Sequence, residues 1–184
     1  MPALHLQPAS GRIDQHATRL YAERAAATWV DYFILSGSTT RGQQLTTTQR
    51  ATVLDLCLDV ASPERLLACC WEPDDLGHAA KRDITPMATM RNLRDQDHAL
   101  AFLQALPASA YIYSHPIFGQ QTFDVKLADV ARRNGVMPAG GKIAKLATAD
   151  VSALSQVAGA SFRLCGTDRR VRSNRHSMPG LQAS

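Results

Sequence analysis

Short apolar runs alternate with longer amphipathic segments along most of the chain. The runs at residues 32–35, 66–71 and 111–113 are continuous, which is typical of strands buried on both faces of a parallel sheet. Weaker strand patterns cover residues 2–6, 83–87, 136–143 and 162–165. The pattern therefore predicts seven strands.

Helical patterns separate these strands. Leu20, Ala25 and Trp29 recur at helical spacing within residues 16–29, and Thr46 with Gln49 has the spacing of a capping box ahead of a second helix. Regular alternation of strands and helices with short links predicts a parallel sheet with helices outside it. Further helices are expected at residues 74–82, 97–106, 125–133 and 151–157.

This order of elements predicts an α/β fold of the (β/α)8 TIM-barrel type, because seven strand–helix units in a row favour a barrel over an open sheet. The chain has 184 residues, whereas a closed barrel of this kind normally takes roughly 200–250. Nothing after residue 168 has a strand pattern. We therefore expect an incomplete barrel of about seven units over residues 1–168, without the eighth strand and the C-terminal helices.

The excess of basic residues lies after residue 168. The formal net charge is +4, and four arginines after Asp168 account for all of it. We expect residues 169–184 to form a basic, disordered tail. A nucleic-acid partner for this tail is disfavoured, because the tail contains no aromatic residue for base stacking.

The sequence argues against several other classes of protein. No apolar run approaches the roughly 18 residues of a membrane-spanning helix, and the first residues lack the pattern of a signal peptide. Cys57 and Cys165 are isolated and Cys69 is next to Cys70, which fits neither a disulfide framework nor a CxxC metal site. We expect a cytoplasmic protein with Cys69 and Cys70 in its core and no membrane partner.

In a barrel of this type the functional site lies at the C-terminal ends of the strands. The turn from Gly37 to Thr39 follows the second strand and offers backbone N–H groups and hydroxyls, which can hold a small carboxylate or phosphate. Ordinary turn chemistry is the alternative for these residues. The residues that sequence position places at the strand ends are His5, Ser38, Thr39, Trp71, Tyr113, Lys142, Lys145 and Thr167.

Two lysines close the sixth expected strand. Burial in a barrel lumen disfavours the charged form of a lysine, and an uncharged amine is a nucleophile for carbonyl groups. We expect Gly140 and Gly141 to clear space for a substrate beside the lysine, and at least one of Lys142 and Lys145 to point to solvent. Tyr113 is either a core residue or a group that relays protons.

An acidic cluster follows the third expected strand and consists of Glu72, Asp74, Asp75 and His78. Such residues can hold a divalent metal. Solvated acids in the first turn of a helix explain the cluster better, because acidic residues favour helix N-termini. We therefore expect no metal site there.

Taken together, the strand-end segments make the chain resemble the dihydrodipicolinate synthase and N-acetylneuraminate lyase family of Schiff-base-forming (β/α)8 enzymes. The resemblance agrees in order and approximate spacing from residue 2 to about residue 168. It rests on four segments, PALHLQPASGRID, YFILSGSTTRGQQLT, YIYSHP and GGKIAKLATADV, with a weaker fifth at FRLCGTD.

The resemblance implies a role for each candidate residue. Gly37, Ser38 and Thr39 match the turn that binds the carboxylate of a 2-oxo acid, and Tyr113 matches the tyrosine that shuttles protons to and from the imine. The strand lysine would form a Schiff base with pyruvate or a related 2-oxo acid. No metal or organic cofactor is implied.

The sequence cues for the lysine conflict. Lys142 matches the Gly-x-Lys strand end of the family and its distance to Gly166, whereas the residues after Lys145 match those that follow the family lysine. We prefer Lys142, because a lysine in the lumen needs a rigid strand beneath it.

The chain also departs from the family. Thr40 and Arg41 replace a Gly-Glu pair, residues 86–88 lack the tyrosine that reaches a neighbouring subunit, and Ile117 and Phe118 stand where dihydrodipicolinate synthases place an arginine. We expect a lyase or aldolase that acts on a 2-oxo acid, but not specifically in lysine biosynthesis. A catalytically inactive, truncated or frameshifted relative is the alternative, and a homo-oligomer is compatible with either.

Overall fold

A parallel sheet forms the centre of the computed structural model, which describes residues 11–165. Within these residues the sheet has six strands in the order β1-β2-β3-β4-β5-β6. The expected strand at 2–6, the tail at 169–184, His5 and Thr167 lie outside the described residues. The strands are β1 (Phe33–Leu35), β2 (Leu66–Cys70), β3 (Thr85–Thr89), β4 (Tyr111–Ser114), β5 (Gly140–Ile143) and β6 (Arg163–Cys165).

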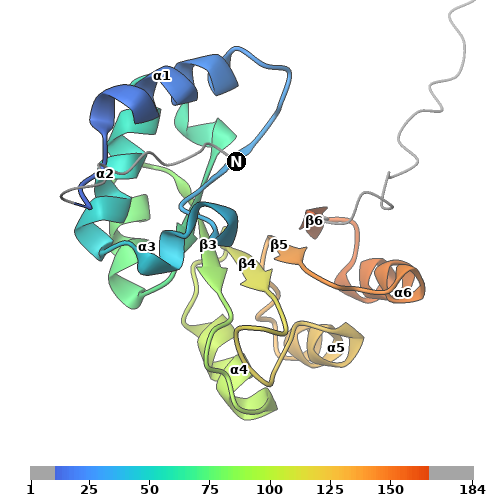
Figure 1. Ribbon diagram of the computed structural model, residues 1–184. Coiled ribbons are helices and arrows are strands. Elements are labelled where there is room, and N and C mark those ends of the chain that lie inside the picture. Colours follow the sequence, from blue (N-terminus) through green and yellow to red (C-terminus); the bar gives the residue numbers. More distant parts are fainter. Residues whose placement is uncertain (1–10, 166–184) are drawn as a thin grey trace, which may run out of the picture.

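The α-helices alternate with the strands along the described chain and lie on the outer side of the curved sheet (Figure 1). Each strand is hydrogen-bonded in parallel to the next strand along the chain. This order confirms a fold of the TIM-barrel type, with an incomplete barrel in the described residues. The helices are α1 (Gln15–Ala26), α2 (Thr47–Leu58), α3 (Pro73–Ala80), α4 (Gln96–Gln104), α5 (Val125–Arg133) and α6 (Thr148–Ala158).

Local signals in the sequence explain where several helices begin. Thr46 and Gln49 form the expected capping box at the start of α2. The side chains of Asp14, Asp95 and Asp124 accept hydrogen bonds from the first turns of α1, α4 and α5. In the part of the chain that is described, no helix is long and apolar enough to cross a membrane.

Two strands, β3 and β5, differ from their expected bounds by two residues or more. β3 starts and ends two residues later than expected, because the apolar and buried run extends through Met90. β5 starts only at Gly140, since residues 136–139 belong to the connection that follows the positive-φ Gly135. β3 therefore ends two residues farther along the chain than the sequence pattern indicates, whereas β5 ends at Ile143, as expected.

Side chains alternate between the two faces of the sheet. Phe33 and Leu35 of β1 face outward into a core shared with α1, α2 and α3, whereas Ile34 packs on the inner face. A second outer core lies between the later strands and α4, α5 and α6. The inner face carries a smaller cluster made of Leu67, Cys69, Trp71, Met87 and Tyr113.

The sheet is open between β1 and β6 in the described residues. A cleft of about 1180 Å³ lies there, and Tyr32, Tyr111 and Arg163 are among the residues that line it. The guanidinium of Arg163 nevertheless donates a hydrogen bond of 3.1 Å to the Tyr32 hydroxyl. Strands at the two edges of the sheet are thus curled close enough for side chains to meet across the opening.

The structure confirms that Cys69 and Cys70 are core thiols, and it buries Cys57 as well. Cys57, Cys69 and Cys70 are buried and unpaired. Burial raises the pKa of Cys57 and of Cys70 to about 12, and it raises the pKa of Cys69 as well. These thiols are therefore almost entirely protonated at neutral pH, and the thiolate is the reactive form.

We expect these three thiols to react with a thiol-labelling reagent at least about a thousandfold more slowly in the native protein than in urea. Mass spectrometry of proteolytic peptides follows each cysteine separately. Labelling of any of the three at the rate of a free thiol in the native protein would contradict the described core.

Candidate active site

The preferred lysine stands on the inner face of the sheet. Lys142 is the third residue of β5, and only 5% of its surface is exposed. The register pairs it with Tyr113 of β4, and paired residues of parallel strands point to the same face. Its Nζ atom lies 4.1 Å from the centroid of the Tyr113 ring, the geometry of a cation–π contact.

The turn that follows β1 reaches the same tyrosine. Ser38 Oγ lies 2.8 Å from the Tyr113 hydroxyl, a hydrogen bond in which either group can donate. Gly37 is buried, Ser38 is half-buried and Thr39 is exposed. Three elements that are far apart in the sequence therefore bring Ser38, Tyr113 and Lys142 together around one phenol group.

The second lysine has a different environment. Lys145 is exposed, has a φ of 59° and lies in the connection between β5 and α6. It still lies near the site, because it contributes to the lowered pKa of His115. The expectation that one of the two lysines points to solvent is thus met by Lys145.

The expected role of the two strand glycines is wrong. A Cβ atom on Gly140 would lie 2.4 Å from Cε1 of Tyr111, and one on Gly141 would lie 2.9 Å from Cγ1 of Ile112. The space that these glycines leave is filled by neighbouring side chains of β4. Gly140 and Gly141 therefore allow close packing of β4 against β5 and clear no room for a substrate.

Aromatic rings cover the tyrosine. The Phe118 ring packs edge-on against Tyr113, with centroids 5.0 Å apart, and against Trp71, with centroids 5.3 Å apart. His115 lies next to Phe118 at 5.4 Å. These rings place an apolar wall beside the phenol and the amine, which limits the access of water.

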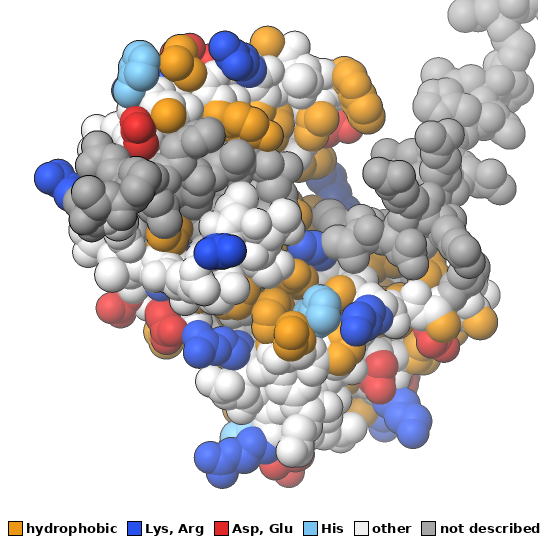
Figure 2. All heavy atoms as spheres, viewed as in Figure 1, with side chains coloured by type: hydrophobic (Ala, Val, Ile, Leu, Met, Phe, Trp, Pro, Cys, Tyr) orange, Lys and Arg blue, Asp and Glu red, His pale blue; other side chains and the backbone are white. Residues whose placement is uncertain are grey.

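The electrostatic setting of the site is basic. Burial lowers the pKa of His115, and the nearby positive charges of Lys145 and Lys142 lower it further. On the face seen in Figure 2, several basic side chains and a histidine lie close to a central group of hydrophobic side chains. Positive charges in such an arrangement attract anions.

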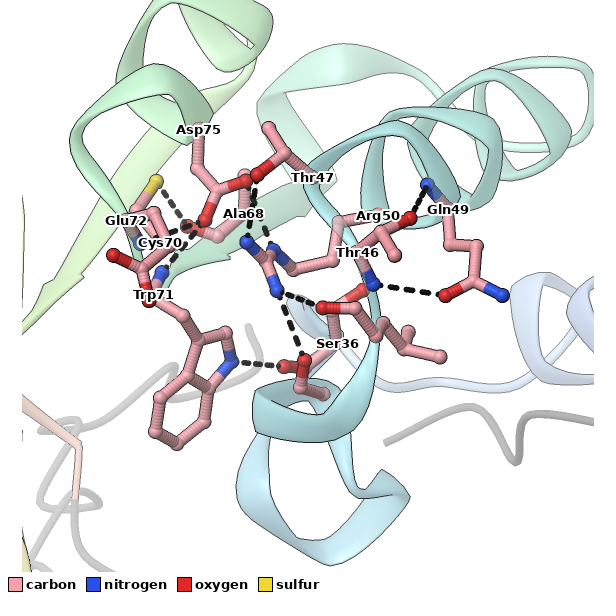
Figure 3. A network of polar contacts seen from close by, with 12 residues as sticks. Ser36, Thr46, Thr47, Gln49, Arg50, Ala68, Cys70, Trp71, Glu72 and Asp75 are labelled. Atoms are coloured by element: carbon pink, nitrogen blue, oxygen red, sulfur yellow. Dashed lines mark hydrogen bonds and ion pairs between the residues drawn. The ribbon is translucent and has the colours of Figure 1, made fainter.

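The sequence analysis missed a buried ion pair behind the turn. Asp75 was expected to be a solvated acid at a helix start, but it is 5% exposed and accepts a hydrogen bond of 2.9 Å from Nε of Arg50 (Figure 3). Asp75 is indeed in the first turn of α3. Its partner could not be inferred from local sequence, because Arg50 lies 25 residues earlier on another helix. The described residues contain no group of three metal-binding side chains.

Comparisons with known sequences identify no relative of this chain. Neither the scan of protein-family models nor the search of curated proteins finds a match.

Comparisons with solved structures do identify a fold. The chain superposes on a protein assigned to the dihydrodipicolinate synthase family from Coccidioides immitis with a TM-score of 0.77 at 15% identity, covering 89% of this chain and 57% of that one. For dihydrodipicolinate synthase from Aquifex aeolicus the TM-score is 0.72 at 15% identity, with coverages of 90% and 62%.

A Sulfolobus solfataricus 2-keto-3-deoxygluconate aldolase variant in complex with pyruvate gives a TM-score of 0.68 at 14% identity, with coverages of 90% and 65%. The chain thus spans about three fifths of the length of these structures. At such low identity the similarity shows a shared fold, and the fold is the one that the sequence resemblance implied.

Proposed function

We propose that this chain carries the Schiff-base site of a lyase or aldolase that acts on pyruvate or a related 2-oxo acid. The observation that carries the proposal is the arrangement around Tyr113, with the Lys142 amine over its ring and the Ser38 hydroxyl at its phenol oxygen. The shared fold with dihydrodipicolinate synthases and a pyruvate-bound aldolase supports it. The proposal also makes this chain a distant relative of those enzymes.

The chemistry of the proposed reaction follows from a buried amine. Nζ of Lys142 attacks the keto carbon of the 2-oxo acid, and the keto oxygen leaves as water after two protons have been transferred to it. The protonated imine that results withdraws electrons, so the neighbouring carbon can lose a proton and become an enamine. The enamine carbon then bonds to the carbon of an aldehyde, whose oxygen takes up a proton, and hydrolysis of the imine frees the lysine. Cleavage is the reverse sequence.

Tyr113 and the turn before it have separate proposed roles. The Tyr113 hydroxyl is hydrogen-bonded to Ser38 and faces the lumen, so it is placed to carry protons to and from the nitrogen and the keto oxygen. The Gly37–Thr39 turn is placed to hold the carboxylate of the 2-oxo acid. Lys145 is assigned no covalent role, because it lies outside the strand.

We propose that the second substrate carries no negative charge at the place where dihydrodipicolinate synthases have an arginine, because Ile117 and Phe118 stand there in this chain. Ile117 is 78% exposed, and Phe118 is part of the aromatic wall.

We place the reaction in the cytoplasm, in keeping with the three unpaired core thiols.

Reductive trapping tests the proposal. Incubation of the chain with pyruvate and borohydride is expected to convert the imine into a stable secondary amine on a single lysine, which mass spectrometry detects as a mass increase on a β5 peptide. Lactate at the same concentration is the control, since it has no keto group. No adduct with pyruvate would contradict the proposal and favour the alternative of a catalytically inactive relative.

Replacement of Tyr113 by Phe tests the proton relay. The variant keeps the ring and its packing but lacks the hydroxyl, so we expect the rate of adduct formation at saturating pyruvate to fall about a hundredfold. Tyr111→Phe is the matched control, because Tyr111 lies on the same strand and its hydroxyl interacts with Arg163, away from the lysine. An equal loss in both variants would assign the effect to packing of β4.

A further inference from the structure

The guanidinium of Arg50 fastens three segments of the chain. Arg50 lies on α2 and is 5% exposed. Its Nε donates to Asp75, one terminal nitrogen donates to the carbonyls of Gly42 and Leu45, and the other donates to the Thr47 hydroxyl. Two of these acceptors are backbone carbonyls of the segment that leads from β1 to α2. The guanidinium therefore binds this loop in addition to forming the ion pair with Asp75.

The partner carboxylate extends the same network to β2. Oδ2 of Asp75 accepts hydrogen bonds from the backbone N–H groups of Trp71 at 2.8 Å and Glu72 at 2.9 Å. This fixes Trp71 directly after the end of β2. The indole N–H of Trp71 then donates a bond of 2.7 Å to the carbonyl of Ser36, the residue that precedes the Gly37–Thr39 turn (Figure 3).

The turn that faces Tyr113 is therefore held at both ends. Trp71 holds it at Ser36, and Arg50 holds it at Gly42. Between these two anchors the carbonyl of Gly37 accepts bonds from the N–H groups of Thr40 and Gly42, at 3.1 Å and 3.0 Å. The position of the turn is thus fixed by contacts to α2, through Arg50, and to α3, through Asp75 and Trp71.

A second ion pair also joins α2 to the end of α3. Arg82, just beyond α3, forms two hydrogen bonds with Asp55 of α2, at 2.6 Å and 2.8 Å. That pair contacts no residue of the turn. Burying a charged pair is costly and often adds little stability, so the buried pair is better explained by what its extra hydrogen bonds position.

We propose that Arg50 and Asp75 are positioning residues, which hold the Gly37–Thr39 turn in the place where it binds the carboxylate of the substrate. This role rests on the proposed function, because it presupposes a 2-oxo acid at Lys142. Arg50 acts through the carbonyls of Gly42 and Leu45, and Asp75 acts through Trp71.

The test compares Arg50→Lys with Arg82→Lys. Lysine keeps the charge opposite Asp75 but lacks the planar fork that reaches the carbonyls and the hydroxyl together. In the trapping assay with pyruvate, we expect Arg50→Lys to raise the half-saturating pyruvate concentration about tenfold and to change the rate at saturation less than about twofold. Arg82→Lys is expected to change neither, since its pair lies outside the network.

Hydrogen exchange gives a readout that does not depend on catalysis. The amides of Thr40 and Gly42 are bonded within the turn, so they should exchange faster in Arg50→Lys and not in Arg82→Lys. If Arg50→Lys does not fold, the double variant Arg50→Met with Asp75→Asn removes both charges and keeps acceptors for the amides at Trp71 and Glu72. It is expected to show the same tenfold shift.

The possible failures are distinguishable. No adduct on the unmodified chain overturns the proposed function, and this inference with it. An adduct whose dependence on pyruvate concentration is the same in Arg50→Lys, or in the double variant, overturns this inference alone. A general loss of adduct amplitude without a change in half-saturation also overturns it, because that is the result of partial unfolding.

Discussion

Replacement of Lys142 by alanine is expected to abolish the reduced pyruvate adduct, whereas Lys145→Ala keeps it. The two lysines are three residues apart but differ in their surroundings. Lys142 is buried on β5 with its amine 4.1 Å from the Tyr113 ring centroid, and Lys145 is exposed beyond the strand. An amine confined beside the proposed proton relay can form and keep an imine, whereas an exposed amine is solvated and unoriented.

Mass spectrometry of the digested protein measures the adduct on each lysine after identical incubation with pyruvate and borohydride. Lys142→Met is the second variant, because it preserves most of the side-chain volume and shows whether the loss follows from the amine or from a cavity. An adduct that disappears only in Lys145→Ala would reverse the assignment. An adduct that survives in the variant lacking both lysines would place the reaction elsewhere on the chain.

The order of the strands and helices could be predicted from the sequence, because each element has a periodic pattern of its own. The run at residues 32–35 and the capping box at Thr46 are local signals, and the structure confirms both. The sequence cues for the lysine conflict, and the preference for Lys142 rests on the expected end of its strand at residue 143, where β5 does end. The residues around the lysines do not show which side chain of β4 lies beside Lys142, because that depends on the register of β5 against β4.

The contacts that the sequence could not give are those between distant segments. Asp75 has the local context of an ordinary helix-start acid, and only the packing of α2 against α3 brings Arg50 to it. Gly140 has the local context of a residue that makes room for a ligand, and only the register of β5 against β4 shows that Tyr111 fills that room. In both cases the residue type was informative, but its partner decided its role.

Gly42 gives the second large expected effect, because it must be glycine for steric reasons. A Cβ atom there would lie 1.6 Å from the carbonyl oxygen of Ser36 and 2.9 Å from Nε1 of Trp71. The first contact is with backbone, so relief requires the turn itself to move. We expect Gly42→Ala to lower the free energy of unfolding by about 3 kcal/mol and to displace the turn that carries Ser38.

Gly77→Ala is the matched control for this substitution. Gly77 lies within α3, and a Cβ atom there would meet nothing within 4 Å, so alanine should raise the free energy of unfolding by about 0.5–1 kcal/mol through its higher helix propensity. Urea unfolding followed by circular dichroism measures both variants, and the trapping assay measures the site. Equal stability of Gly42→Ala and the unmodified chain would contradict the close approach of Gly42 to Ser36. The clash lies between Ser36 and Gly42, the two residues at which the turn is held, so relief of the clash must displace the turn. A destabilised Gly42→Ala that binds pyruvate normally would therefore show that binding tolerates this displacement.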